Sequence, residues 1–436
     1  MTEAVSLTFP EQFWLGALIL LFIGDFVHFA SQRDPLAVYQ PPVFVMAFMS
    51  YYCIVGPVQR LLTNEWTHVT VNFRYAAVFS WAGATVFYLA VRLGYGLFSS
   101  WYPQRRFVPG FDHLLAMRLG ARLCWIGLGV FALGNGPRVI AYLNPFNVTG
   151  SDFFWLGGID LGPLTNYANQ AVNLLIPGTL LQFAGWVRSD RRLLPWLLWM
   201  LASVAIFTSL GFRWRIVTLI VPMVLLWFLT RGRRPAPMVV GASAFGLVLL
   251  AGLIEQTRSY GTGLSLDAAS DVSATNFLTR GLNESSVFLV TGGVIENTPG
   301  GSPFVGLQPI ISALLFPVPR TIWQDKNSFE YLINALSDLF RSRVLANGQA
   351  ILNYGEYYLM FGWLSLVLMG LLSGWLLRCL WNWFSLRRSE TLAQVTYLCT
   401  CALLYMWVSR GYLPQVALIF AFGSLPLFWF YYRSAR

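Results

Sequence analysis

The sequence predicts an all-α protein that crosses a membrane many times. Hydrophobic residues make up 56% of its 436 residues and charged residues only 11%, whereas a soluble domain carries about 25% charged residues. The apolar residues form long runs separated by short breaks that contain arginine, which is the pattern of helices spanning a bilayer. The runs lack the alternation of membrane β-strands, and the aromatic content of 16% excludes a disordered chain.

Eleven runs approach the ~20 residues that a spanning helix needs. The predicted spans are 13–30, 42–60, 76–98, 121–142, 171–187, 194–210, 214–230, 237–255, 355–381, 391–409 and 412–432. They divide the chain into about eight helices in 1–255, one large loop at 256–352 and about three helices in 353–436. Within the loop we expect short helices and a re-entrant or interfacial segment, VGLQPIISALLFPVP.

Arginine occurs at every second break between the predicted spans. The basic breaks contain Arg33, Arg105, Arg106, Arg118, Arg188, Arg191, Arg192, Arg231, Arg233, Arg234, Arg387, Arg388, Arg433 and Arg436. Because cytoplasmic loops are rich in Lys and Arg, we expect these breaks and the C-terminus inside. The N-terminus and the 256–352 loop are then expected outside, in the periplasm of a bacterium. Asp25, Arg92 and Arg378 are left within spans, assigned to neither side.

The net charge of +10 does not indicate a nucleic-acid partner. No basic segment interleaved with aromatic residues stands outside the apolar runs, and basic loops are explained by contact with anionic lipid. All five cysteines fall in apolar runs, so we expect no disulfide framework. Cys399 and Cys401 lie on different helix faces with no histidine nearby, so neither a metal site nor a cofactor is expected.

The residues that point to chemistry are charges outside the membrane, close to span ends, where charge is costly and usually functional. Arg213 and Arg215 lie in GFRWRI, between two spans with almost no loop. They either bind a phosphate, for which guanidinium groups are well shaped, or anchor a tight turn to lipid. Arg280 and Glu284 are four residues apart and either belong to a site or form a helix-surface ion pair.

Arg320 follows two prolines in FPVPRTIWQDKN, and Lys326 comes six residues later. This turn either holds a guanidinium at a fixed height or lets an arginine snorkel from an interfacial helix. Arg410, in VSRGYLP, is expected at the outer end of a span.

The segment NYGEYYLMFGW places Asn353, Glu356 and Tyr357 at the outer membrane face. Glu356 needs a partner there or it becomes protonated. It is either a base or sugar-hydroxyl ligand, or one member of a structural pair with an arginine.

The sequence NYGEYYLMFGWLSLVLMGLLSGWLL resembles the bacterial oligosaccharide repeat-unit polymerases of the Wzy type, which are relatives of the O-antigen ligases. The resemblance rests on Gly355-Glu356 followed by Phe361-Gly362 after a large late loop, and on Arg213 at a tight outer turn. It also includes a Pro-Arg-x-x-Trp-x-x-Lys stretch at Pro319, Arg320, Trp323 and Lys326. It covers about 200–432, and the first half matches only in being helical. The related ligases use a loop histidine, whereas this loop has none.

The resemblance implies polymerisation of polyprenyl-pyrophosphate-linked oligosaccharide repeat units at the periplasmic face of the inner membrane, by metal-independent inverting glycosyl transfer. It implies that Glu356 or Glu284 is the base and that Asn353 and Tyr357 bind sugar. The residues implied to bind pyrophosphate are Arg213, Arg215, Arg320, Arg280, Arg410 and Lys326. The implied partners are the lipid-linked donor and acceptor, membrane lipids and a chain-length-determining co-polymerase.

Two alternatives remain open from the sequence. One is a ligase or other lipid-sugar glycosyltransferase; its metal-dependent members usually place an acidic pair in the first external loop, where this chain has only Glu65. The other is a transporter or flippase for lipid-linked sugar, which would favour charges at mid-membrane and repeat symmetry.

Overall fold

The computed structural model describes residues 7–97, 113–145, 164–189, 193–259, 263–264, 285–318 and 330–434. Its helices are α1 (Phe9–Ser31), η1 (Ala37–Tyr39), α2 (Pro41–Ser50), η2 (Tyr51–Val55), α3 (Gly56–Thr63), α4 (Ala76–Leu97), α5 (His113–Asn135), α6 (Arg138–Ala141), α7 (Thr165–Gln170), η4 (Ala171–Leu174), α8 (Leu175–Ser189), α9 (Leu193–Ser209), α10 (Arg213–Leu229), α11 (Pro237–Thr257), α14 (Ser285–Asn297), α15 (Gln308–Leu315), α16 (Glu330–Phe340), α17 (Arg343–Ala346), α18 (Asn353–Phe361), α19 (Trp363–Ser385), α20 (Thr391–Ser409), α21 (Leu413–Gly423) and α22 (Leu425–Ser434). Two short antiparallel pairs join β1 (Thr67–His68) to β2 (Val71–Asn72) and β3 (Arg258–Ser259) to β4 (Gly263–Leu264).

The chain is an all-α protein, and among the described residues seven helical segments are long and apolar enough to cross a membrane. They are Phe9–Ser31, Pro41–Thr63, Ala76–Leu97, His113–Asn135, Trp363–Ser385, Thr391–Ser409 and Leu413–Arg433. The predicted count of eleven is not confirmed. The run 171–187 is divided between η4 and the 15-residue α8, which rises only ~22 Å, and α9 and α10 have 17 residues each. An apolar run does not reveal where a helix changes its winding, as it does between η4 and α8.

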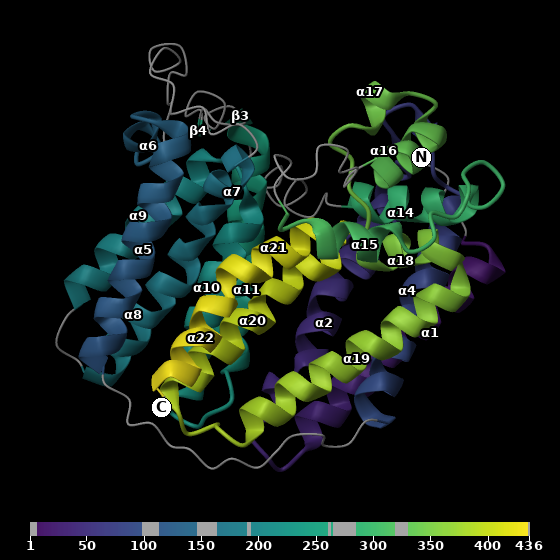
Figure 1. Cartoon of the computed structure of the whole chain (residues 1–436). Coiled ribbons are helices and arrows are strands. Elements are labelled where there is room, and N and C mark those ends of the chain that lie inside the picture. Colours follow the sequence, from purple (N-terminus) through teal and green to yellow (C-terminus); the bar gives the residue numbers. More distant parts are fainter. Residues whose placement is uncertain are drawn as a thin grey trace.

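Figure 1 shows how the long helices are arranged. Helices α5, α8 and α9 lie on one side of the molecule, α1, α4 and α19 lie on the other, and α20 to α22 run between them. Within these groups α5 packs against α8, and α4 packs against both α1 and α19. The short helices α14 to α18 gather near the N-terminus, and the C-terminus lies at the opposite end of the bundle.

The contact between α4 and α19 is made by backbone on backbone. A Cβ atom added at Gly94 would lie 2.2 Å from the carbonyl oxygen of Leu371, and one added at Gly374 would lie 2.1 Å from that of Val91. Small residues permit such close approach between helices in a membrane. These two glycines therefore fix the register of α19 on α4.

Two predicted spans end elsewhere than expected. The single span 355–381 is two helices, because Gly362 adopts φ 68° and ψ −143° and separates α18 from α19. Only glycine occupies this region readily. The span 121–142 is also displaced: α5 ends at Asn135, and Gly136 has φ 59°.

The segment predicted as a large outer loop contains a helix that belongs to the core. In α14, the residues from Val287 to Ile295 are buried, and the helix packs against α4 and α18. The Ser80 hydroxyl donates to the carbonyl oxygen of Phe288 at 2.9 Å, and the Leu352 amide donates to the Thr291 hydroxyl at 2.8 Å. The predicted interfacial run forms the short α15. Leu307, just before this helix, and Ile311 and Leu314 within it are 50–74% exposed.

One end of the bundle joins several of the arginine-bearing breaks. Arg234 Nη1 donates to the Ala30 carbonyl oxygen at 2.9 Å, and Arg388 lies 3.6 Å from the Asp34 carboxylate. Arg188 Nε donates to the Thr391 hydroxyl at 3.0 Å. We call this the arginine-bearing end.

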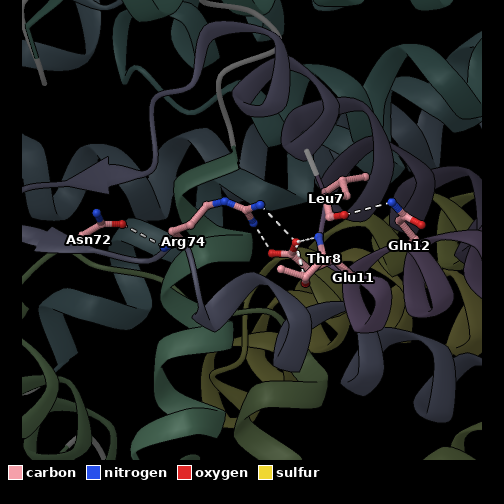
Figure 2. Close-up of polar contacts among 6 residues, drawn as sticks. All are labelled: Leu7, Thr8, Glu11, Gln12, Asn72 and Arg74. Atoms are coloured by element: carbon pink, nitrogen blue, oxygen red, sulfur yellow. Dashed lines mark hydrogen bonds and ion pairs between the residues drawn. The ribbon is translucent and has the colours of Figure 1, made fainter. Parts of the chain in front are cut away.

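The opposite end is held by an ion pair between the start of α1 and the chain before α4 (Figure 2). Glu11 accepts the Thr8 amide at 2.7 Å and Arg74 Nη2 at 3.0 Å, and Arg74 Nη1 reaches its other oxygen. Figure 2 shows Arg74 directed at the carboxylate, with its own amide donating to Asn72. We call this the α18 end, because the β1–β2 pair here reaches the chain before α18 through His68 Nε2, 2.9 Å from Gln349 Oε1.

Candidate functional site

α10 ends at Leu229, shortly before Arg233 and Arg234, which lie at the arginine-bearing end. The start of α10 therefore lies at the α18 end. Gly211 has φ 74° and turns the chain from α9 into α10, which begins at Arg213 after the extended Phe212. The first amides of a helix have no partner within it, and the helix dipole favours an anion there. The side chain of Arg213 lies outside what the structure describes.

Arg215 is held rigidly in the first turn of α10. Its Nε donates to Asn173 Oδ1 at 2.8 Å, and the Asn173 amide in turn donates to Gln170 Oε1 at 2.8 Å. Its guanidinium carbon lies 4.5 Å from the Phe212 ring centroid and 5.1 Å from that of Trp214.

The charge of Arg215 is not compensated in the described part of the chain. The residue is 4% exposed, and its Nη1 is buried without a hydrogen-bond partner. The ion pairs among the described residues do not include Arg215. A buried cation without a partner is strongly unfavourable, so this group is suited to an anion such as phosphate.

Glu356 occupies the first turn of α18, outside the seven candidate spans. Its Oε1 accepts the Tyr331 hydroxyl at 2.5 Å, and both its oxygens lie 3.0 Å from the Leu413 amide. Burial raises the pKa of Glu356 from 4.5 to about 7, while the hydrogen bonds from Tyr331 and Leu413 act in the opposite direction. The predicted arginine partner is replaced by a hydroxyl and an amide, and the carboxylate joins α16, α18 and α21.

Asn353 and Tyr357 are also buried at the start of α18. Asn353 Oδ1 accepts the Tyr354 amide at 2.9 Å, and its Nδ2 is buried without a partner in the described chain. The Tyr357 hydroxyl accepts the indole N–H of Trp407 at 2.8 Å, and its ring is 1% exposed. A sugar could reach either residue only after local opening.

Arg410 lies in the turn between α20 and α21, which packs directly on the start of α18. The Gly411 amide donates to the Ile351 carbonyl oxygen at 2.6 Å, and a Cβ at Gly411 would lie 2.7 Å from the Leu352 carbonyl oxygen. Glycine is required at this approach. Arg410 is partly exposed. It immediately precedes Gly411, which contacts the chain at the start of α18.

The structure brings two predicted clusters to the same end through α21 (Figure 1). α21 begins at Leu413, which binds Glu356, and it also packs against η4, which carries Asn173, the partner of Arg215. The start of α10 and the start of α18 thus flank one short helix. The remaining predicted site residues, Arg280, Glu284, Arg320 and Lys326, lie outside the described residues.

Sequence reasoning missed three residues that hold this site: Gln170, Asn173 and Tyr331. Asn173 had a recognisable signature, since a polar amide within the apolar run AVNLLIPG is costly unless it has a partner. Tyr331 had none, because it lies 25 residues before Glu356 in a segment of ordinary amphipathic pattern.

In the described part of the chain, no group of three or more His, Cys, Asp or Glu residues is arranged to hold a metal ion. Comparisons of the chain with protein-family models, with curated proteins and with solved structures find no match.

Proposed function

We propose that this chain polymerises polyprenyl-pyrophosphate-linked oligosaccharide repeat units, without a metal ion, at the membrane face that holds the α18 end. The single observation that carries the proposal is Arg215: a buried guanidinium at the start of a helix, fixed through Asn173, with an N–H that has no partner among the described residues. The resemblance in sequence at Gly355-Glu356 and Phe361-Gly362 supplies the reaction.

In the proposed reaction the acceptor sugar hydroxyl attacks the anomeric carbon of the donor glycan. The new glycosidic C–O bond forms as the bond from that carbon to the pyrophosphate oxygen breaks, and the hydroxyl proton passes to a base. Negative charge grows on the pyrophosphate as it leaves. Arg215 and the amides at the start of α10 would stabilise this charge, because they are oriented before the reaction begins.

Glu356 and Glu284 remain the proposed bases. A pKa of about 7 suits Glu356 to accept a proton near neutral pH. Its oxygens are engaged by Tyr331 and Leu413, so in this proposal α16 and α21 separate before an acceptor reaches it. If Glu284 is the base instead, Glu356 acts only by positioning α21.

The proposed orientation places the arginine-bearing end in the cytoplasm, following the positive-inside rule. The N-terminus and the α18 end then face the periplasm and the C-terminus faces the cytoplasm. The membrane is proposed to be the bacterial inner membrane, where polyprenyl-pyrophosphate substrates would be presented.

The test is a reconstitution of the purified full chain in liposomes with lipid-pyrophosphate-linked repeat units and EDTA. We expect a ladder of repeat multiples on a gel. Arg215→Gln should slow its formation by roughly 100-fold or more, the usual effect of removing one fixed donor to a developing anion. Arg343→Gln is the matched control, since Arg343 is an exposed arginine on α17 at the same end.

Folding of each variant is checked by size-exclusion chromatography and circular dichroism. A normal ladder from folded Arg215→Gln would overturn the role of Arg215. Folded wild-type protein that forms no ladder but flips the lipid-linked substrate between leaflets would overturn the polymerase proposal in favour of a transporter.

A further inference from the structure

Among the ionisable residues of the candidate membrane spans, three gather around Tyr88 and Tyr95: Asp25 on α1, Arg92 on α4 and Arg378 on α19. A charged side chain at this depth is costly and is normally paired. Their two positive charges and one negative charge leave one positive charge over. The position of the excess charge identifies a site that the proposed polymerase reaction does not use.

The negative charge is committed to Arg92. Arg92 Nε lies 2.6 Å from Asp25 Oδ2, and the Tyr88 hydroxyl donates to the same oxygen at 2.6 Å. The Arg92 guanidinium also lies 5.0 Å from the Phe29 ring centroid. Asp25 therefore compensates Arg92.

In this cluster Arg378 is the cation that has no acidic partner among the described residues. Its guanidinium carbon lies 5.2 Å from the Tyr95 ring centroid, while that of Arg92 lies 5.7 Å from the same ring. Tyr95 is fixed by donating its hydroxyl to Gln40 Oε1 at 2.8 Å. Within the part of the chain that the structure describes, Arg378 Nε is buried with no hydrogen-bond partner, and no ion pair includes Arg378.

The backbone fixes the place of this cation. Gly374, one turn before Arg378, is the residue at which α19 touches α4, so Arg378 is held beside Tyr95. Arg378 lies seven residues before the end of α19 at Ser385, which is ~10 Å along the helix. Arg378 is therefore closer to the arginine-bearing end of α19 than to its other end, fifteen residues away at Trp363. Arg378 is partly exposed while its Nε is buried, so its guanidinium lies at the surface of the bundle, against Tyr95.

We propose that Arg378 and Arg92, on the two sides of Tyr95, bind the phosphate of an anionic lipid headgroup in the leaflet at the arginine-bearing end. A lipid phosphate supplies the missing negative charge, and a guanidinium binds it through paired N–H donors. Arg92 contacts Asp25 through its Nε, on the side of the guanidinium nearest its own helix. The same chemistry is offered by an anionic phospholipid and by a polyprenyl phosphate.

The test measures lipid binding by the purified full chain in detergent, by native mass spectrometry. The probes are phosphatidylglycerol, undecaprenyl phosphate and, as the zwitterionic reference, phosphatidylcholine. We expect phosphatidylglycerol or undecaprenyl phosphate to bind in preference to phosphatidylcholine, and Arg378→Gln to weaken that binding about tenfold, as loss of one charge-assisted contact implies. The tighter of the two anionic probes identifies the source of the phosphate.

The matched control is Arg433→Gln. Arg433 is an exposed arginine on α22, at the end of the bundle opposite the α18 end, and its guanidinium carbon lies 5.0 Å from the Trp429 ring centroid. This substitution should change binding less than twofold. Binding unaffected by Arg378→Gln, or weakened equally by Arg433→Gln, would overturn the site.

Arg378→Met provides a second test, read out as a melting temperature, in case Arg378→Gln does not fold. It removes the uncompensated charge and keeps an unbranched apolar chain. Phosphatidylglycerol should raise the melting temperature of the wild type and leave that of Arg378→Met unchanged. An equal rise in both proteins would contradict the proposal.

Discussion

Replacing Glu356 with Gln should make the stability of the protein less dependent on pH between about 5 and 8. In the wild type the carboxyl group is 1% exposed and its pKa is raised to about 7 by burial. Gln has nearly the same shape, stays neutral at every pH, and its oxygen can still accept from Tyr331 and Leu413. The substitution therefore isolates the effect of the charge.

The size of the effect follows from the difference between the usual pKa of 4.5 and about 7 in the folded protein. At ~1.4 kcal/mol per pKa unit, this is roughly 3 kcal/mol. The folded state binds the proton more tightly than the unfolded state does. This contribution to stability is therefore fully present below about pH 4.5, declines as the pH rises, and is lost above about pH 7.

The assay is thermal unfolding in one detergent, followed by tryptophan fluorescence at pH 5, 6, 7 and 8. The melting temperature of the wild type should fall by a few degrees more than that of Glu356→Gln. The control is Glu330→Gln, an exposed carboxylate on α16, which should follow the wild type. Parallel curves for wild type and Glu356→Gln would refute the argument that burial of this carboxylate raises its pKa.

Three further predictions concern packing and the ends of the bundle. Gly374→Ala should destabilise the protein by ~1–3 kcal/mol in the same assay, because its methyl group would meet backbone of α4. Gly96→Ala, whose added Cβ meets nothing within 4 Å, is the control, and equal effects would contradict the close contact of α4 and α19. Gly362→Ala should cost ~1–3 kcal/mol through backbone strain at φ 68°, and an unchanged melting temperature would show that α18 and α19 are not separated in this way. In a double-mutant cycle, Arg74→Ala and Glu11→Ala should show a coupling of ~0.5–3 kcal/mol, and additive effects would show that the pair does not join α1 to the chain before α4.

The class of the protein follows from composition with little help from packing. A chain with 11% charged residues in arginine-bordered apolar runs must satisfy its backbone groups within each run, and a helix does this locally. For the same reason helices occupy the predicted runs, although their ends and number differ. Helix breaks cannot be predicted in this way. The break between α18 and α19 depends on the backbone conformation of one residue, Gly362, within a continuous apolar run.

The candidate site was predictable only in part. Arg215 and Glu356 could be identified from the sequence because a charge near an apolar run is costly and is usually functional. Their partners do not stand out: Asn173 lies 42 residues from Arg215, and Leu413 lies 57 residues from Glu356. No local pattern in the sequence pairs residues at such separations.

By itself, therefore, the sequence determined the helical membrane architecture and the positions of the costly charges, because both follow from local solvation of side chains and backbone. Only the tertiary structure decided which charges are compensated. It pairs Asp25 with Arg92, surrounds Glu356 with a hydroxyl and an amide, and leaves Arg215 and Arg378 with buried, unpartnered N–H groups within the described chain. Compensation depends on which helices touch, and that is decided by close contacts such as the one at Gly374.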